Sequence, residues 1–176
     1  MRARLHARHL LFGFLVALIA AAAPLLLRAA ETAFSVSLDA SQSQPRQVEE
    51  TTAASLQRDY GHAWRSMAAA LEENKAGLLG ADFVGLAKEQ LSQAIADQGK
   101  SGLKRRYIDH GHQVRVVFYS PDGSAIELHD TVRLEIQLLD GDKVIHSDQG
   151  TFHYLALMTP AENSWKVRLL ESVSGF

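Results

Sequence analysis

Four polar side chains in the C-terminal half of the chain have the types and positions that acid–base chemistry requires. Asp130 interrupts an otherwise apolar alternation of residues, and Glu171 lies on the apolar side of a later alternation. His146 and Tyr154 share a register on the segment between them. A carboxyl group in apolar surroundings is costly to ionise, so its pKa rises and it can transfer a proton near neutral pH. We therefore expect Asp130, His146, Tyr154 and Glu171 to line one pocket.

The same pattern has a structural explanation that involves no chemistry. Long curved strands contain β-bulges, and one extra residue turns every later side chain to the opposite face. A bulge near His129 would place Asp130 in water. The sequence also lacks a nucleophile elbow and a glycine-rich phosphate loop. We therefore assign no catalytic residue, and the sequence favours binding over catalysis.

The other chemically distinctive residues predict neither a metal site nor a cofactor. Cysteine is absent, which excludes disulfides and zinc–thiolate sites. No pair of histidines has a recognised ligand spacing. We interpret the histidines in or near the predicted sheet as solvent-facing: His110, His112, His129, His146 and His153.

The charge distribution argues against nucleic acid as a partner. The chain has 176 residues and a net charge of −2, but its first thirty residues contain four arginines and no acid. The remainder carries 14 basic and 20 acidic residues, a net charge of −6. Phosphate binding requires clustered positive charge, so we expect no nucleic-acid partner.

The N-terminus predicts a membrane segment. Arg2, Arg4 and Arg8 precede eighteen uncharged residues, which as a helix would be about 27 Å long and nearly span a hydrocarbon core of about 30 Å. Basic residues before such a span stay in the cytoplasm. Residues 1–30 are therefore either a retained anchor or a cleaved signal peptide. The apolar side chains of the segment include Leu10, Phe12, Phe14, Leu15, Leu18, Leu25 and Leu27.

The next twenty residues, 31–50, predict a flexible linker. They are rich in Ser, Gln and Ala and have no sustained periodicity. The alternation from Phe34 to Leu38 is alternatively a short edge strand. The folded domain is expected over residues 51–176.

Two amphipathic helices begin this domain. Thr51 or Thr52 is expected to cap the first helix, and Gly77 or Gly80 to end it. A second helical pattern follows from Phe83 and ends before Gly99. Large apolar residues at helical spacing form the stripe of the first helix: Leu56, Tyr60, Trp64, Met67, Leu71 and Leu78.

After Gly102 the apolar period changes from 3.6 to 2, which predicts strands. Turn signals containing Pro121-Asp122-Gly123 and Asp140-Gly141-Asp142 separate them. A regular alternation indicates an antiparallel sheet with one covered face, which must curl around the helices. The predicted strands run over 114–119, 126–138, 143–158 and 165–173.

This order of elements resembles the NTF2-like superfamily, also called cystatin-like or SnoaL-like. The resemblance covers about Thr52 to Val173 and rests on the long first helix with its aromatic stripe and on the closing Ser164-Trp165-Lys166-Val167-Arg168 strand. It implies an α+β cone of two to three helices packed on a curved antiparallel sheet of about four strands. Members of the superfamily are small-molecule enzymes or pure binding and assembly modules.

We therefore expect a single-pass protein of a bacterial inner membrane, with a cytoplasmic N-terminus and a periplasmic NTF2-like domain. Its expected role is that of a binding or scaffold module, an accessory or assembly subunit of a membrane complex. A homodimer through the outer sheet face fits this expectation. The alternative is a protein secreted to the periplasm, either a SnoaL-like isomerase or dehydratase or a small-ligand carrier, with Asp130 and Glu171 in its pocket.

Overall fold

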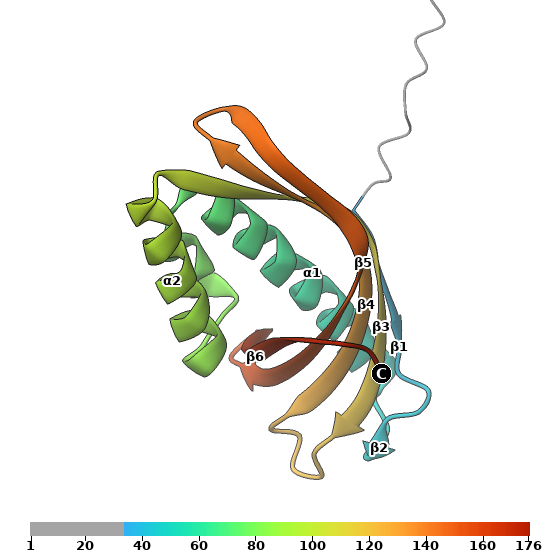
Figure 1. Cartoon of the computed structure of the whole chain (residues 1–176). Helices are drawn as coiled ribbons and strands as arrows, with labels where there is room; N and C mark the ends of the chain where they lie inside the picture. Colours follow the sequence, from blue (N-terminus) through green and yellow to red (C-terminus); the bar gives the residue numbers. More distant parts are fainter. Residues whose placement is uncertain (1–33) are drawn as a thin grey trace, which may run out of the picture.

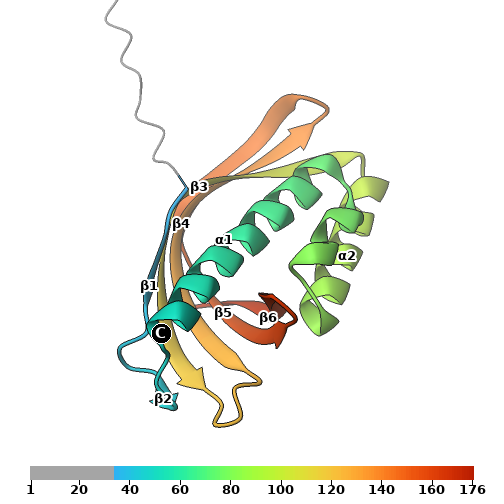
Figure 2. The ribbon, with the colours of Figure 1, turned by 180° about the vertical axis from the view of Figure 1, so that it is seen from behind.

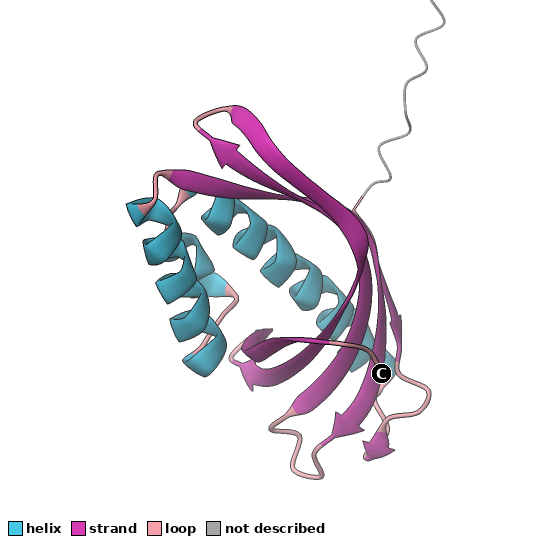
Figure 3. Cartoon of the chain, viewed as in Figure 1, coloured by secondary structure: helices cyan, strands magenta, loops and turns pink. Residues whose placement is uncertain are grey.

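A curved six-stranded β-sheet wraps around the helices of the domain (Figures 1 and 3). The computed structural model describes residues 34–176. In chain order the elements are β1 (Val36–Asp39), β2 (Gln44–Pro45), α1 (Glu50–Glu73), the 3₁₀-helix η1 (Ala76–Ala81), α2 (Gly85–Lys100), β3 (Leu103–Tyr119), β4 (Ile126–Asp140), β5 (Lys143–Ala161) and β6 (Ser164–Val173). Seen from behind, α1 crosses the hollow of the sheet and α2 lies beside it (Figure 2). The α+β class expected from the sequence is confirmed.

The sheet is mixed and has more strands than the sequence predicted. The strand order is β1-β3-β4-β5-β6, and β2 also pairs with β3. Strands β3 to β6 form the expected antiparallel meander. Strands β1 and β2 pair parallel with β3, because the helices between them form the crossover that parallel pairing requires. The predicted antiparallel sheet of about four strands is therefore correct for β3 to β6 and incomplete, because it lacks the parallel strands β1 and β2.

Part of the predicted linker belongs to this sheet. Val36 and Leu38 pack against the hydrophobic core, and Val36 lies opposite His112 in the ladder with β3. Gly61 of α1 permits the close approach, since a Cβ atom there would lie 3.2 Å from the ring of Phe34. The edge-strand alternative is the one observed, and the linker prediction does not hold over residues 36–45.

The stripe on the first helix forms the centre of the core, with one exception. Five of its six residues are buried, but Leu78 is 39% exposed. Helix α1 ends before Asn74, which has the left-handed φ of 52°, so Leu78 lies in η1 and outside the helical register. The predicted helix end at Gly77 or Gly80 is therefore too late. The predicted caps are wrong as well, because Thr51 and Thr52 lie inside α1 and Glu49 is the N-cap residue.

Strand β4 keeps its alternation of buried residues from Ile126 to Leu134. Four register shifts occur in the antiparallel ladders, and in each the extra residue belongs to β3, β5 or β6. Ile126, Leu128, Asp130, Val132 and Leu134 are therefore all buried on one face. The bulge that would have turned Asp130 to solvent is absent from β4.

The predicted membrane segment lies outside the described residues. Within residues 34–176, none of the helices combines the length and the apolar character needed to cross a bilayer.

The different burial of two leucines from one predicted stripe gives a test of the fold. Leu71→Ala should lower the free energy of unfolding by about 2–5 kcal/mol because Leu71 is only 2% exposed. Leu78→Ala, the matched control, should lower it by less than about 1 kcal/mol. Urea unfolding followed by tryptophan fluorescence measures both, and equal losses would contradict the helix end at Asn74.

Candidate functional site

A buried chain of hydrogen bonds joins α1, β3 and β4. Asp130 accepts hydrogen bonds on its Oδ2 atom from the Tyr60 hydroxyl, at 2.8 Å, and from Nδ1 of His112, at 2.7 Å. Nε2 of His112 lies 2.6 Å from Oδ2 of Asp109. The second oxygen of Asp109 accepts the backbone N–H of Gly111 at 2.7 Å. We call Tyr60, Asp109, His112 and Asp130 the Asp130 cluster.

The Asp130 cluster is enclosed by aromatic rings. Tyr60 and Asp130 have no exposed surface, and His112 is 2% exposed. The His112 ring lies 4.6 Å from the Trp64 ring and 5.8 Å from the Phe34 ring. Side chains therefore fill the space between α1 and the sheet around Asp130, and a substrate has no access to its carboxylate.

The two flanking carboxylates determine the charge of His112. Burial lowers the pKa of His112, but the hydrogen bonds and the charges of Asp109 and Asp130 outweigh burial and raise that pKa to about 9. Both ring nitrogens then donate. Burial and the charge of Asp130 raise the pKa of Tyr60 well above its ordinary value, so its hydroxyl stays protonated and donates to Asp130.

Of the four residues expected to line one pocket, the structure brings two together. Tyr154 lies directly opposite Asp130 in the β4–β5 ladder, and its ring packs 5.1 Å from Trp64. Burial is the first cause that raises the pKa of Tyr154, followed by the charges of Tyr107 and Asp130. His146 is exposed on the far part of β5, beside Arg105 and Asp148.

Glu171 is exposed because β6 contains a bulge. Leu157 and Met158 of β5 lie opposite Leu169 and Val167, so Arg168 is the extra residue. After Arg168, the positions of β6 that face the core and those that face solvent are exchanged. Leu170 packs against the core opposite Ala156, and Glu171 turns to solvent.

Sequence reasoning missed His112 as a member of the site. The expectation that the sheet histidines face solvent is wrong for His112, because the bulge in β3 between Asp109 and His112 turns the His112 ring inward, where it contacts both Asp130 and Asp109. Gly111, with a φ of 117°, provides the conformation that this bulge needs. The local signal for this part of the site is an Asp and a His three residues apart with a glycine between them. Only the strand register of the folded sheet shows that their side chains contact each other.

The Asp130 cluster reaches the surface at one end. The side chain of Asp109 is 14% exposed. With Trp64, Arg65, Tyr107 and Leu134 it lines a small hollow of about 240 Å³. Among residues 34–176, no three histidine or carboxylate side chains are placed to hold a metal ion.

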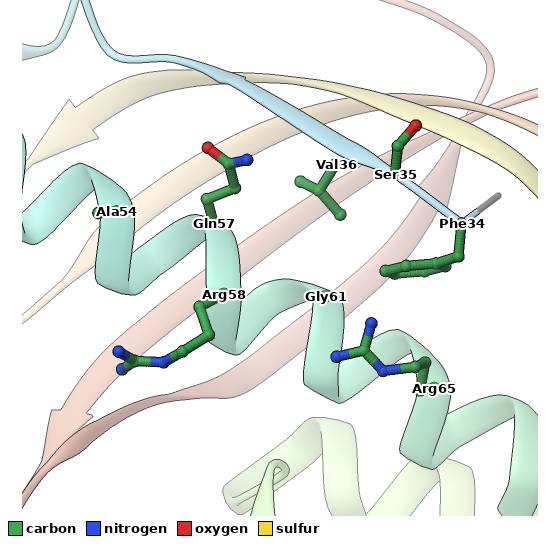
Figure 4. Close-up of a pocket in the computed structure, with 8 residues that line it drawn as sticks. All are labelled: Phe34, Ser35, Val36, Ala54, Gln57, Arg58, Gly61 and Arg65. Carbon is green, nitrogen blue, oxygen red and sulfur yellow. The ribbon is translucent and has the colours of Figure 1, made fainter.

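A larger groove, of about 460 Å³, lies between β1 and the first half of α1 (Figure 4). In Figure 4, Phe34 and Val36 point from the β1 side toward the helix, and Gln57, Arg58 and Arg65 extend from α1. The guanidinium of Arg65 lies over the Phe34 ring, 4.7 Å from its centroid. The lining residues are Phe34, Ser35, Val36, Ala54, Gln57, Arg58, Gly61 and Arg65. The groove thus combines an apolar floor with two cationic side chains.

The raised pKa of His112 predicts a loss of stability at alkaline pH. Because the folded pKa of about 9 lies above the ordinary value of 6.5, protonated His112 stabilises the fold fully below pH 6.5. This contribution, about 3 kcal/mol, disappears as the pH rises through about 9. Urea unfolding between pH 6.5 and 9.5 measures it. The His146→Gln variant should show the same decline, and a flat profile of the unaltered protein would contradict the charged state of His112.

Replacing Asp130, which points into the core, should lower the stability of the fold more than replacing Glu171, which points to solvent. Asp130→Asn removes the charge that His112 faces and should lower the free energy of unfolding at pH 7 by about 2–3 kcal/mol. It should also lower the pKa of His112, which an NMR titration of its ring protons reports. Glu171→Gln is the control and should change the free energy by less than about 0.5 kcal/mol. Similar losses in both variants would rule out the bulge at Arg168.

Comparison with known proteins identifies the fold. No protein-family model and no curated protein matches the sequence. The intermembrane space region of the chloroplast protein ARC6 matches with a TM-score of 0.62 and 17% identity, over 73% of this chain and 98% of that one. The protein Aln2 from a Streptomyces species matches with a TM-score of 0.46 and 14% identity, over 72% and 94% of the two chains. A Nostoc punctiforme protein described as having a cystatin-like fold matches with a TM-score of 0.44 and 10% identity, over 72% and 93%. The described domain has the NTF2-like, or cystatin-like, fold.

Proposed function

We propose that this chain is a membrane-tethered binding module, an accessory or assembly subunit of a membrane complex in a bacterial envelope. Residues 1–30 anchor it in the inner membrane with the N-terminus in the cytoplasm, and the NTF2-like domain is periplasmic. The basic residues before an uncharged run of eighteen support this orientation. The likeness in fold to a region of ARC6 that lies in an intermembrane space agrees with a domain outside the cytoplasm.

The filled interior is the observation that carries the binding role. An enzyme of this fold needs a catalytic group that substrate can reach, whereas Asp130 has no exposed surface and is bonded to Tyr60 and His112. The groove between β1 and α1, in contrast, is open at the surface and presents both apolar and cationic side chains. Such a surface suits recognition of another protein more than conversion of a small molecule.

Reporter fusions test the proposed topology. Alkaline phosphatase fused after Phe176 should be active, and a fluorescent protein fused before Met1 should fluoresce in the cytoplasm. The chain should stay with the membrane after alkaline carbonate extraction, and its intact mass should include residues 1–29. A soluble periplasmic protein that lacks these residues would refute the tether.

A periplasmic SnoaL-like isomerase or dehydratase, or a small-ligand carrier, is the second proposal. One observation favours it: Asp109 lines the hollow of about 240 Å³ and is linked through His112 to Asp130, which provides a route for a proton. On this proposal Asp109, and not Glu171, is the carboxylate that a ligand meets. Native mass spectrometry of the mature protein should then show a bound small molecule that Asp109→Asn releases.

A further inference from the structure

The open edge of β1 faces the groove. β1 is the first strand in the sheet order, so within residues 34–176 it pairs with β3 on one side only. The carbonyl of Ser35 accepts the N–H of His112 at 2.9 Å, and Val36 is the register partner of His112. In a parallel ladder, successive residues direct their backbone groups to alternate sides. The N–H and C=O groups of Val36 and Leu38 therefore point away from β3, along the edge.

The helix beside this edge presents one continuous stripe. Ala54, Arg58, Gly61 and Arg65 are spaced by three or four residues, so they lie on the same side of α1. Gly61 lets Phe34 and Val36 approach the helix closely, and the two arginines lie on either side of this contact along the stripe. Figure 4 shows this stripe below β1, with the groove between them. An added strand would cover the stripe as it continued the sheet.

The charge of the groove indicates what kind of strand fits. Its eight lining residues include two arginines and no carboxylate. Arg58 is held by Asp59, with Nε to Oδ1 at 2.9 Å, and Asp59 also accepts the backbone N–H of Trp165. Arg65 forms no ion pair with any described residue and contacts only the face of Phe34 as a cation. Arg65 thus presents its charge to an incoming chain without a direct ion pair to any residue of 34–176, although Asp109 lines the neighbouring hollow with it.

We propose that an extended, acidic peptide segment of a partner protein docks along β1 as an additional strand of the sheet. Its backbone pairs with Val36 and Leu38, an apolar side chain rests on Phe34 and Val36, and a carboxylate pairs with Arg65. The stretch from Phe34 to Asp39 accommodates about six residues of the partner, about 20 Å. Backbone pairing gives such docking its affinity and the groove gives it specificity. This inference rests on the proposed role as a binding module and names the chemistry of the partner.

Selection from a phage-displayed library of random linear peptides tests the inference. The bait is the full chain in detergent micelles. Enriched peptides should contain Asp or Glu near an apolar residue, and added salt should weaken their binding. Failure to enrich any peptide, or enrichment without acidic residues, would overturn the proposal.

A charge-reversed pair of variants separates the groove from the rest of the surface. Arg65→Glu should weaken binding of an enriched peptide at least tenfold by fluorescence anisotropy, and replacing the peptide acids by lysine should restore binding to this variant. Lys88→Glu, on the exposed surface of α2, is the matched control and should leave affinity unchanged. Equal effects of the two substitutions would exclude the groove as the site.

Amide exchange reports the strand pairing itself. In NMR hydrogen exchange, the amides of Val36 and Leu38 should become protected when the peptide binds. Unchanged exchange at both positions would refute strand addition even if the peptide binds. If the chain fractionates with the membrane but binds no peptide, only the β1 docking site is refuted. If the chain is instead released into the periplasm, the membrane tether is refuted, and the peptide measurements above still decide whether β1 is a docking site.

Discussion

The pairing of protonated His112 with two carboxylates is the interaction on which the interior of this domain depends. An isolated charge at this depth would cost several kcal/mol, and the opposite charges and hydrogen bonds of the cluster offset that cost, although Oδ1 of Asp130 has no hydrogen-bond partner among the described residues. Asp130 receives two donors on one oxygen, and His112 donates from both ring nitrogens. Because Tyr60 belongs to α1, His112 to β3 and Asp130 to β4, the same bonds hold the helix in its position against the curved sheet.

Because this arrangement occupies the interior, the surfaces on which the domain can bind another molecule lie at its edges. In a cone-shaped fold the space between helix and sheet is the natural ligand site. Here Tyr60, Trp64 and Tyr154 fill much of that space around Asp130. Two of the open sites are the small hollow at Asp109 and the larger groove at the sheet edge. In that groove, Arg65 lies without an ion pair to any described residue, beside a strand edge that is unpaired within residues 34–176. The chemistry of that edge suits protein recognition.

The elements that local periodicity encodes were predictable. The stripe from Leu56 to Leu71 and the alternation of β4 from Ile126 to Leu134 each describe one face of one element, and both are buried as expected. Strand β1 was harder because its alternation, from Phe34 to Leu38, is too short to separate a strand from a linker. The packing against Gly61 and the pairing with β3 that decide between them lie far away in the sequence. Leu78 followed the helical spacing in sequence, but the chain leaves the helix at Asn74.

The amino-acid sequence by itself determined the α+β order and the antiparallel meander, and it placed Asp130 in register with the apolar residues of β4, because each follows from residues close together in the chain. Only the tertiary structure decided what surrounds Asp130. One extra residue in β3 brings His112 to it, with Asp109 on the other side of the His112 ring, and one in β6 turns Glu171 away. A bulge changes the facing of side chains without changing composition or spacing. Its position is set by pairing with a neighbouring strand, and that pairing exists only once the sheet has formed.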